Sequence, residues 1–228
     1  MDHAVIEQMV SLARITKGER VLEIGTGTGA VTSELLRVAS EVEGYEIDRK
    51  NFDATQEAIS DRRLRLHLGD AFRATPKFDV LVSSLPYSES ASFVEWISRM
   101  LYDRAVVILQ DDFAMKIMSL PGHRDYRAIS VIAQSSTHIE MLAKVPRSAF
   151  SPQPRVNSVI VSLKPIRRLS IAQTKAIKRL FALRRRTISA VVSTNSGGPG
   201  LNRDRRRVYS LTPEEVLDIL PMMRSEYG

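Results

Sequence analysis

An alternation of short apolar runs with helical patterns over about the first 110 residues constrains the fold most strongly. Each run is about five residues long and rich in β-branched side chains, which is typical of strands buried on both faces of a parallel sheet. Residues 30–39 place apolar side chains at helical spacing between the first two runs. The expected strands are Arg20–Ile24, Val42–Ile47, Arg65–Leu68, Phe78–Ser83 and Ala105–Leu109.

Two later apolar runs, Thr137–Val145 and Asn157–Leu163, are joined by a proline-rich turn and predict a hairpin that closes the sheet with an antiparallel edge. After Lys164-Pro165 only helical patterns follow, over Ser170–Val192 and Thr212–Leu220. The second begins Thr-Pro-Glu-Glu, which predicts a threonine N-cap and a capping box with the second glutamate. We therefore expect an α/β protein with a Rossmann-like, doubly wound domain over residues 1–164 and a small all-helical domain over residues 165–228.

The composition excludes several classes of protein. The chain has no cysteine, which rules out disulfides, thiolate metal sites and a cysteine nucleophile. Its four histidines lack the spacing of metal ligands, so no metal is expected. No apolar run reaches the roughly 18 residues of a membrane span, and the N-terminus does not resemble a secretory signal. A cytoplasmic monomer is expected.

Positive charge is concentrated near the C-terminus. From Leu163 onward the chain has 14 Lys and Arg against 5 Asp and Glu, a net charge of +9, whereas the whole chain carries +7. A solvated surface usually mixes both signs, so this excess favours a polyanionic partner, and nucleic acid in particular.

A glycine-rich turn, Glu23-Ile-Gly-Thr-Gly-Thr-Gly29, follows the first expected strand and opens a helix. Glycines at alternate positions let the backbone turn sharply and approach a ligand closely. Dinucleotide enzymes have a related turn, but their third glycine comes three positions after the second, whereas Gly27 and Gly29 are two apart. The alternative interpretation of the three glycines is a purely structural tight turn that binds no ligand.

Acidic residues end the next two expected strands. Glu46 comes 17 residues after Gly29, where a carboxylate can accept hydrogen bonds from both hydroxyls of a ribose. Asp70 follows the third strand, where it could accept from an adenine amine. Taken singly, Glu46 could be a surface acid and Asp70 a helix N-cap. Together with the glycine turn they indicate a site for an adenosyl ligand without phosphates.

The chain resembles the KsgA family of ribosomal RNA adenine dimethyltransferases, which use S-adenosylmethionine. The similarity runs nearly from end to end. The most family-specific stretches are Leu120-Pro-Gly-His-Arg-Asp-Tyr126, Phe150-Ser-Pro-Gln-Pro-Arg-Val-Asn-Ser158 and Phe181-Ala-Leu-Arg-Arg-Arg-Thr187.

The resemblance implies a set of site residues. It predicts a catalytic loop of Ser84, Leu85, Pro86 and Tyr87. The residues implied to hold S-adenosylmethionine are Glu23, Gly25, Gly27, Gly29, Glu46, Asp70, Ala71 and Ser84.

Two features depart from the family pattern. The family has asparagine at the position of Ser84, where its side-chain oxygen and the next carbonyl accept the two N–H bonds of the target amine. A serine reaches less far, which predicts slower transfer. The family also has a Gln-x-Phe-Leu lid just ahead of the position of Asp2, so either the lid is absent or the start of the sequence lies too late.

The basic tail supplies the expected RNA contacts. Arginine binds phosphates through its planar fork, and the candidates are Arg184, Arg185, Arg186, Arg203, Arg205, Arg206 and Arg207. The resemblance implies N6-dimethylation of two adjacent adenosines in the hairpin near the 3′ end of 16S ribosomal RNA, within an immature 30S particle. Two alternatives are a non-catalytic assembly factor for the small subunit, favoured by Ser84, and a resistance methyltransferase that acts on the large subunit.

Overall fold

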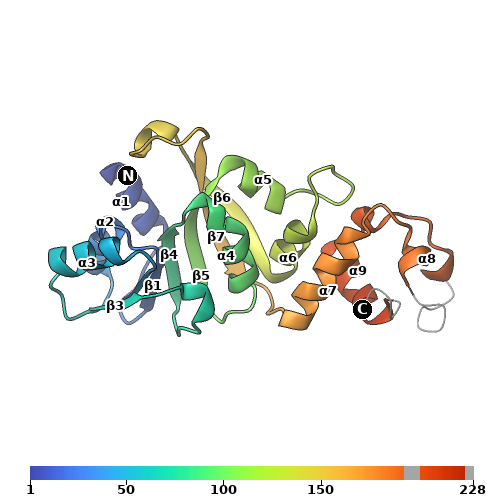
Figure 1. Ribbon diagram of the computed structural model, residues 1–228, viewed down its shortest axis with the longest axis horizontal. Helices are drawn as coiled ribbons and strands as arrows, with labels where there is room; N and C mark the ends of the chain where they lie inside the picture. Colours follow the sequence, from blue (N-terminus) through green and yellow to red (C-terminus); the bar gives the residue numbers. More distant parts are fainter. Residues whose placement is uncertain (193–200, 224–228) are drawn as a thin grey trace.

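A computed structural model describes residues 1–192 and 201–223 of the chain. Its centre is a seven-stranded sheet in the order β3-β2-β1-β4-β5-β7-β6 (Figure 1). Strands β1 to β5 pair in parallel, whereas β7 runs antiparallel to both β5 and β6. The strands are β1 (Arg20–Ile24), β2 (Glu41–Glu46), β3 (Leu64–Leu68), β4 (Val80–Ser84), β5 (Arg104–Gln110), β6 (Thr137–Val145) and β7 (Ser158–Pro165).

The sheet carries a layer of helices on each face. Because side chains of a strand alternate between the two faces, Val21 of β1 packs in one apolar cluster and its neighbour Leu22 in the other. The first cluster joins the sheet to α1 and α2, and the second joins it to α4, α6 and the C-terminal helices. The described helices are α1 (His3–Leu12), α2 (Ala30–Val38), α3 (Arg49–Ala58), α4 (Ser90–Ile97), α5 (Asp111–Ile117), α6 (Ala128–Ser136), α7 (Ile171–Ala182), α8 (Ile188–Val191) and α9 (Pro213–Ile219).

This arrangement confirms the predicted α/β class, the doubly wound order and the antiparallel hairpin. One connection differs from the others. Between β3 and β4 the chain forms only a 3-10 turn, η1 (Ala71–Arg73), followed by an extended stretch to Asp79. The sheet therefore lacks a helical crossover at this point.

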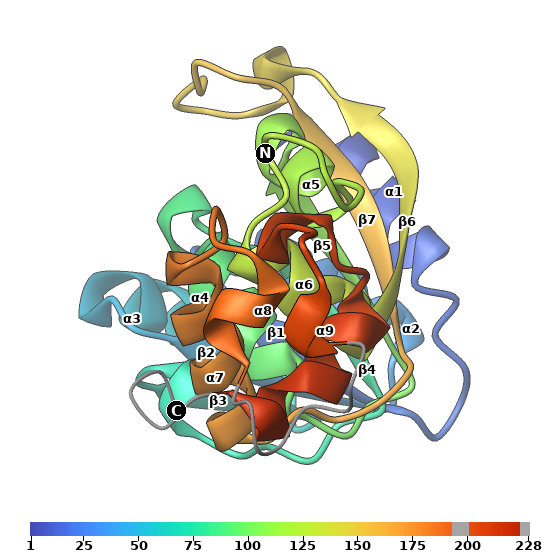
Figure 2. The ribbon, with the colours of Figure 1, turned by 90° about the vertical axis from the view of Figure 1, so that its right-hand side faces the viewer.

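Helices α7 and α9 pack on α6, and Figure 1 shows α8 beyond them at the end of the molecule. Figure 2 shows the same helices from that end. Tyr126 ahead of α6 and Phe181 of α7 meet edge to face, with ring centroids 5.6 Å apart. Their apolar side chains continue the cluster on that face of the sheet. The boundary between residues 164 and 165 stays a prediction, since the two parts share one core.

The predicted helix over Ser170–Val192 is wrong as a single element. Helix α7 ends at Ala182, and α8 begins only at Ile188. The backbone between them pairs with a later segment. The carbonyls of Arg184 and Arg186 accept hydrogen bonds from the N–H groups of Tyr209 and Val208, both at 3.1 Å. A tertiary pairing has overridden the local helical pattern. By contrast, α9 has the predicted threonine N-cap and capping box.

None of the helices in the described part of the chain combines the length and the apolar character that a membrane crossing needs.

Candidate active site

The predicted site residues of four strands meet at one edge of the sheet. Strands β3, β2, β1 and β4 are adjacent and parallel, so their carboxyl ends lie side by side. Two loops face each other there, because a Cβ added at Gly25 would lie 3.8 Å from the Pro86 ring. The glycine turn and the Ser84–Tyr87 loop are thus direct neighbours at this edge of the sheet.

The glycine turn requires glycine at its second and third positions. Gly27 and Gly29 have positive φ angles of 56° and 84°, which L side chains rarely adopt. A side chain at Gly29 would also come within 2.8 Å of Ile59. Thr55 holds the turn from α3 by donating its hydroxyl to the Gly27 carbonyl (2.8 Å). The turn is therefore rigid before any ligand binds.

Glu46 is the best-fixed acid of the site. It is only 6% exposed, and its two carboxylate oxygens accept hydrogen bonds from the backbone N–H groups of Gly27 and Asp48, each at 2.8 Å. Each carboxylate oxygen has two lone-pair sites, so one remains on each for a ligand. Two neighbouring acceptors at this position suit the vicinal hydroxyls of a ribose.

Glu23 lies deeper than Glu46. It is 1% exposed, and the Thr32 hydroxyl of α2 donates to its carboxylate at 2.6 Å. Burial raises the pKa of Glu23 to about 8, helped by the negative charge of Glu46 and opposed by the bond from Thr32. Its observed contact is to α2, which favours a role in positioning the glycine turn. Direct contact with a cofactor stays a prediction.

Asp70 and Ala71 follow β3 beside Glu46, whose carbonyl accepts from Gly69 (2.7 Å). The alternative of an N-cap is realised at Asp70, because its carboxylate accepts from the Phe72 N–H (2.9 Å) and caps η1. The side chain remains 32% exposed, and its second oxygen lies 3.4 Å from Arg73. Capping and binding of an adenine amine are compatible for a carboxylate with this exposure.

Ile47 is a candidate that the sequence interpretation missed. It follows Glu46 directly and is 72% exposed although it is apolar. An apolar side chain between Glu46 and Asp48 at the carboxyl edge offers a flat contact for an adenine ring. The sequence predicts a strand that ends at Ile47, whereas β2 ends at Glu46. Ile47 therefore lies in the loop beside the site and not in the strand.

The Ser84–Tyr87 loop begins at the last residue of β4, which pairs with Ile108 of β5. Leu85 is buried (3% exposed), and among the described residues no intramolecular hydrogen bond reaches its carbonyl. The Tyr87 hydroxyl lies 2.5 Å from Ser158 Oγ at the start of β7. This contact joins the loop to the Phe150–Ser158 segment that carries the family resemblance.

The N-terminus reaches the same edge. Met1 Sδ lies 3.8 Å from Ser84 Oγ, at the limit of a weak hydrogen bond. The thioether therefore leaves the Ser84 hydroxyl largely available as an acceptor or donor.

An acidic cluster outside this site involves His3 of α1, with Glu7 and Glu34. Their ligand atoms lie within 4.8 Å of one another, a grouping that the spacing of histidines alone did not reveal. His3 and Glu7 are exposed, and Arg37 pairs with Glu34 at 3.1 Å. His3 lies 3.3 Å from Glu7 within α1 and 4.0 Å from Glu34 of α2, so contacts within and between the two helices account for the cluster.

The structure brings the two predicted arginine stretches together. Thr187 forms an antiparallel bridge with Arg207, and the Arg207 guanidinium donates to the Arg185 carbonyl. Arg206 is engaged within the protein, since it pairs with Asp204 (2.9 Å) and Glu215 (2.8 Å), which raise its pKa. Six of the seven arginines are exposed: Arg185, Arg186, Arg203, Arg205, Arg206 and Arg207.

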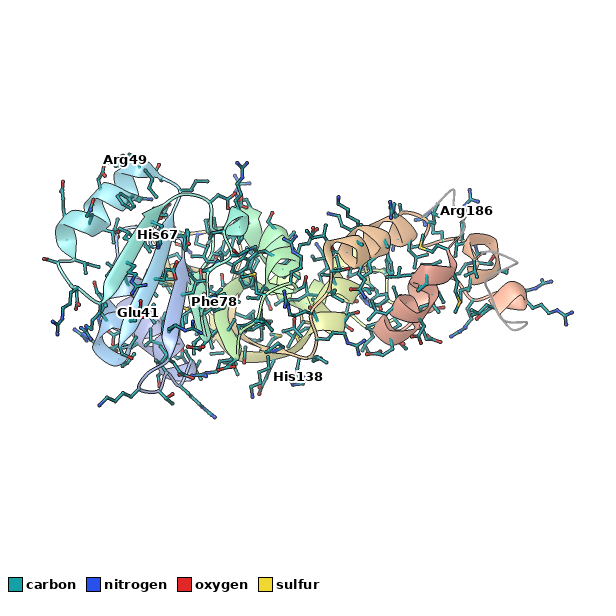
Figure 3. The ribbon with its side chains drawn as sticks, turned by 90° about the horizontal axis from the view of Figure 1, so that it is seen from below. Glu41, Arg49, His67, Phe78, His138 and Arg186 are labelled. Atoms are coloured by element: carbon teal, nitrogen blue, oxygen red, sulfur yellow. The ribbon has the colours of Figure 1, made fainter. Side chains whose placement is uncertain are left out.

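Figure 3 places Arg186 among the C-terminal helices, at the opposite end of the molecule from Glu41 and Arg49. The exposed arginines thus lie well away from strands β2 and β3. Glu46 is the last residue of β2, and Asp70 follows β3. RNA that contacts both the arginines and the site must extend along the long axis of the molecule.

Comparisons with known proteins agree with this geometry. The family model for ribosomal RNA adenine dimethylase matches residues 1–220. Ribosomal RNA small subunit methyltransferase A of Thermotoga maritima is 30% identical over 98% of this chain and 82% of its own. A protein of Thermococcus gammatolerans named "Probable ribosomal RNA small subunit methyltransferase A" is 32% identical, covering 96% of this chain and 84% of its own.

Solved structures share the fold. A dimethyladenosine transferase from Plasmodium falciparum superposes with a TM-score of 0.79 at 24% identity, covering 95% of this chain and 94% of its own. The 23S rRNA methyltransferase ErmE gives a TM-score of 0.68 at 23% identity and covers 98% of each chain.

Proposed function

Since the chain belongs to the ribosomal RNA adenine dimethylase family, we propose that it dimethylates N6 of adenosines in small-subunit ribosomal RNA with S-adenosylmethionine. We further propose two adjacent adenosines near the 3′ end of that RNA as its targets, and an immature small subunit as the particle it binds. The observation that carries the proposal is the meeting of Glu46, Asp70 and the Ser84–Tyr87 loop at one edge of the sheet.

The residues present fit the cofactor. The free lone pairs of Glu46 suit the ribose hydroxyls, and the exposed carboxylate of Asp70 suits the adenine amine. Gly25 and Gly27 leave room for a close approach, because a Cβ at Gly27 would meet nothing within 4 Å. S-adenosylmethionine, when bound, supplies an electrophilic methyl group on a positively charged sulfur.

The catalytic loop has to make an aromatic amine nucleophilic. The lone pair of adenine N6 is delocalised into the ring, so the nitrogen must turn toward tetrahedral geometry before it can attack. In this proposal the Leu85 carbonyl and the Ser84 hydroxyl accept hydrogen bonds from the two N–H groups and stabilise the positive charge that develops on nitrogen. Tyr87 supplies a ring on which the extruded base stacks. Pro86 keeps the loop rigid.

The deciding experiment is transfer of labelled methyl groups from S-adenosylmethionine to immature small subunits, followed by nucleoside analysis. We expect N6,N6-dimethyladenosine in the small-subunit RNA. Large subunits and mature, fully methylated small subunits serve as controls. Methylation of the large subunit would show that the substrate is large-subunit RNA. Lack of product despite proven cofactor binding would favour the assembly factor that Ser84 suggests as the second candidate.

A further inference from the structure

A groove of about 690 Å³ runs from η1, just after Asp70, to the end of the strands opposite the Ser84–Tyr87 loop. Its walls are the extended stretch before β4, the connection from α4 to β5, and residues 168–171 leading into α7. The groove exists because the connection from β3 to β4 has no helix. Since β4 is five residues long and a strand rises about 3.3 Å per residue, the end of the groove at Asp79 and the Ser84–Tyr87 loop are separated by roughly 15 Å.

The floor of the groove is apolar and aromatic. Trp96 packs between Phe72 and Phe78, with ring centroids 5.9 and 6.0 Å away. Phe72 is only half-buried, and Leu101 and Ile171 at the margin are 69% and 55% exposed. The groove thus presents apolar surface of the size that a planar group can cover.

The rim of the groove is cationic. Among the residues lining it are five cations and two acids. Arg20 and Asp79 neutralise each other, since the Arg20 guanidinium makes two hydrogen bonds to the Asp79 carboxylate (3.1 and 2.7 Å). Arg73 lies 3.4 Å from the Asp70 carboxylate. The remaining cations are Lys77, Arg99 and Arg168, with Asp103 as the opposing acid.

The start of α7 adds to this positive field. Ser170 caps the helix and lines the groove together with Ile171. The N-terminus of a 12-residue helix carries a partial positive charge that favours anions. The apolar floor favours a planar group, and the cationic rim and the helix terminus favour an anion. Together they indicate a ligand that is both planar and anionic.

We propose that this groove is a second RNA site, which binds a single-stranded nucleotide of the ribosomal RNA remote from the target adenosine. The base contacts Phe72 and Leu101, and its phosphates contact Lys77 and Arg168. The groove borders the link between the large domain and the arginine-bearing helices, so an RNA strand can pass from one to the other. This inference rests on the proposed function only in its choice of ribosomal RNA as the source.

The chain offers a local probe, since Trp96 is its one tryptophan and lies beneath the groove. Titration of the full chain with a short single-stranded RNA should change Trp96 emission. Lys77→Ala combined with Arg168→Ala should lower the slope of log affinity against log salt by about 1.4, at about 0.7 per lost contact on a single strand. Arg73 is left unchanged because it contacts Asp70.

Lys50→Ala combined with Arg62→Ala is the matched control, since both are exposed cations near strands β2 and β3. This double variant should keep the wild-type slope. An abasic RNA should bind the wild type more weakly and lose the emission change, because the apolar floor then has no partner. Cross-linking with an RNA that carries 4-thiouridine should label residues 72–78 or 99–103.

Two results would overturn the proposal. One is an RNA titration in which Trp96 emission is unchanged and cross-links fall elsewhere. The other is an equal emission change with poly-glutamate, which would assign the groove to an acidic protein. The methyl-transfer assay separates this inference from the proposed function: the Lys77 and Arg168 double variant should raise KM for the subunit and keep kcat. If RNA changes the Trp96 emission of the wild type but the protein transfers no methyl group, only the enzymatic role is refuted.

Discussion

The Tyr87 hydroxyl and Ser158 Oγ lie 2.5 Å apart, although 71 residues separate them in the chain. Ser158 is fully buried at the first residue of β7. The aromatic ring of the Ser84–Tyr87 loop is thereby fixed to the sheet. Orientation of this kind lowers the cost of placing a base against the ring.

Removing this bond from either side should slow methyl transfer equally. A neutral hydrogen bond contributes about 1 kcal/mol, so Tyr87→Phe and Ser158→Ala should each lower kcat/KM about five-fold. The double variant should be no slower than either single one, because both lose the same contact. Additive losses in this mutant cycle would show that the two hydroxyls act independently.

Loss of the Glu46 carboxylate should weaken binding of S-adenosylmethionine. Hydrogen bonds to a charged group contribute about 1.5–3 kcal/mol, which predicts a rise in Kd of roughly ten- to a hundred-fold for Glu46→Ala in calorimetric titration. Glu43→Gln is the matched control, since Glu43 lies on the opposite face of the same strand and bonds Tyr45. If the Glu46 variant binds S-adenosylmethionine with unchanged affinity, Glu46 does not bind the ribose hydroxyls.

Glu23 should make the stability of the protein depend on pH. Its pKa rises from an ordinary 4.5 to about 8 on folding, so the folded state holds a proton that the unfolded chain has lost. Stability is therefore full below about pH 4.5 and falls as pH rises through 8, at up to about 1.4 kcal/mol per pH unit.

Urea unfolding at several pH values measures this dependence. Glu23→Gln keeps the size of the side chain and an oxygen for the Thr32 hydroxyl, and it cannot ionise. We expect the variant to lose most of the fall in stability between pH 5 and 8. An identical pH profile in wild type and variant would contradict a protonated, buried Glu23.

The exposed arginines around the C-terminal helices should determine part of the salt dependence of RNA binding. Replacing Arg185 and Arg205 by Ala should lower the log–log salt slope by roughly 1.5, at about 0.7–0.9 per phosphate contact. Arg65→Ala on β3 is the control, because that arginine pairs with Glu41 at the other end of the molecule. An unaltered slope in the double variant would place the phosphate contacts elsewhere.

The sequence predicted those parts of the structure that follow from local periodicity. Strand β1 begins and ends at the predicted residues, and the capping box of Thr212 and Glu215 starts α9 as expected. Both features depend on neighbouring residues alone. The break after Ala182 was missed because it follows from hydrogen bonds to residues 208 and 209, which no local pattern records.

The candidate site was predictable to the same extent. The order of glycine turn, Glu46 and Asp70 along the chain indicated three strand ends, and the sheet places these ends side by side. The direction of the Glu23 side chain toward Thr32 could not be read from sequence, because it depends on how α2 packs on β1. The groove above Trp96 was equally hidden, since it arises from a helix missing between β3 and β4.

The last prediction concerns Ser84, which the family pattern has as asparagine. The site around it is complete: the Leu85 carbonyl has no internal partner among the described residues, Tyr87 is anchored, and Glu46 is fixed by two backbone donors. If the loop is active but has one weaker hydrogen-bond acceptor, restoring the asparagine should increase its rate of methyl transfer. Ser84→Asn should therefore raise the rate of N6 methylation about ten-fold, if the restored acceptor contributes about 1.4 kcal/mol to the transition state.

Ser84→Ala is the matched control, because it removes the hydroxyl without offering a new acceptor. If the serine hydroxyl contributes, this variant should be slower than the wild type, giving the order Asn, Ser, Ala in single-turnover rate. The rate is measured as labelled methyl transfer to immature small subunits, with nucleoside analysis to separate mono- from dimethyladenosine. Equal rates for Ala and Ser would show that the Leu85 carbonyl acts alone. A slower Asn variant with intact cofactor binding would mean that this loop is shaped around serine, and that Ser84 is an adaptation of the site to its own substrate.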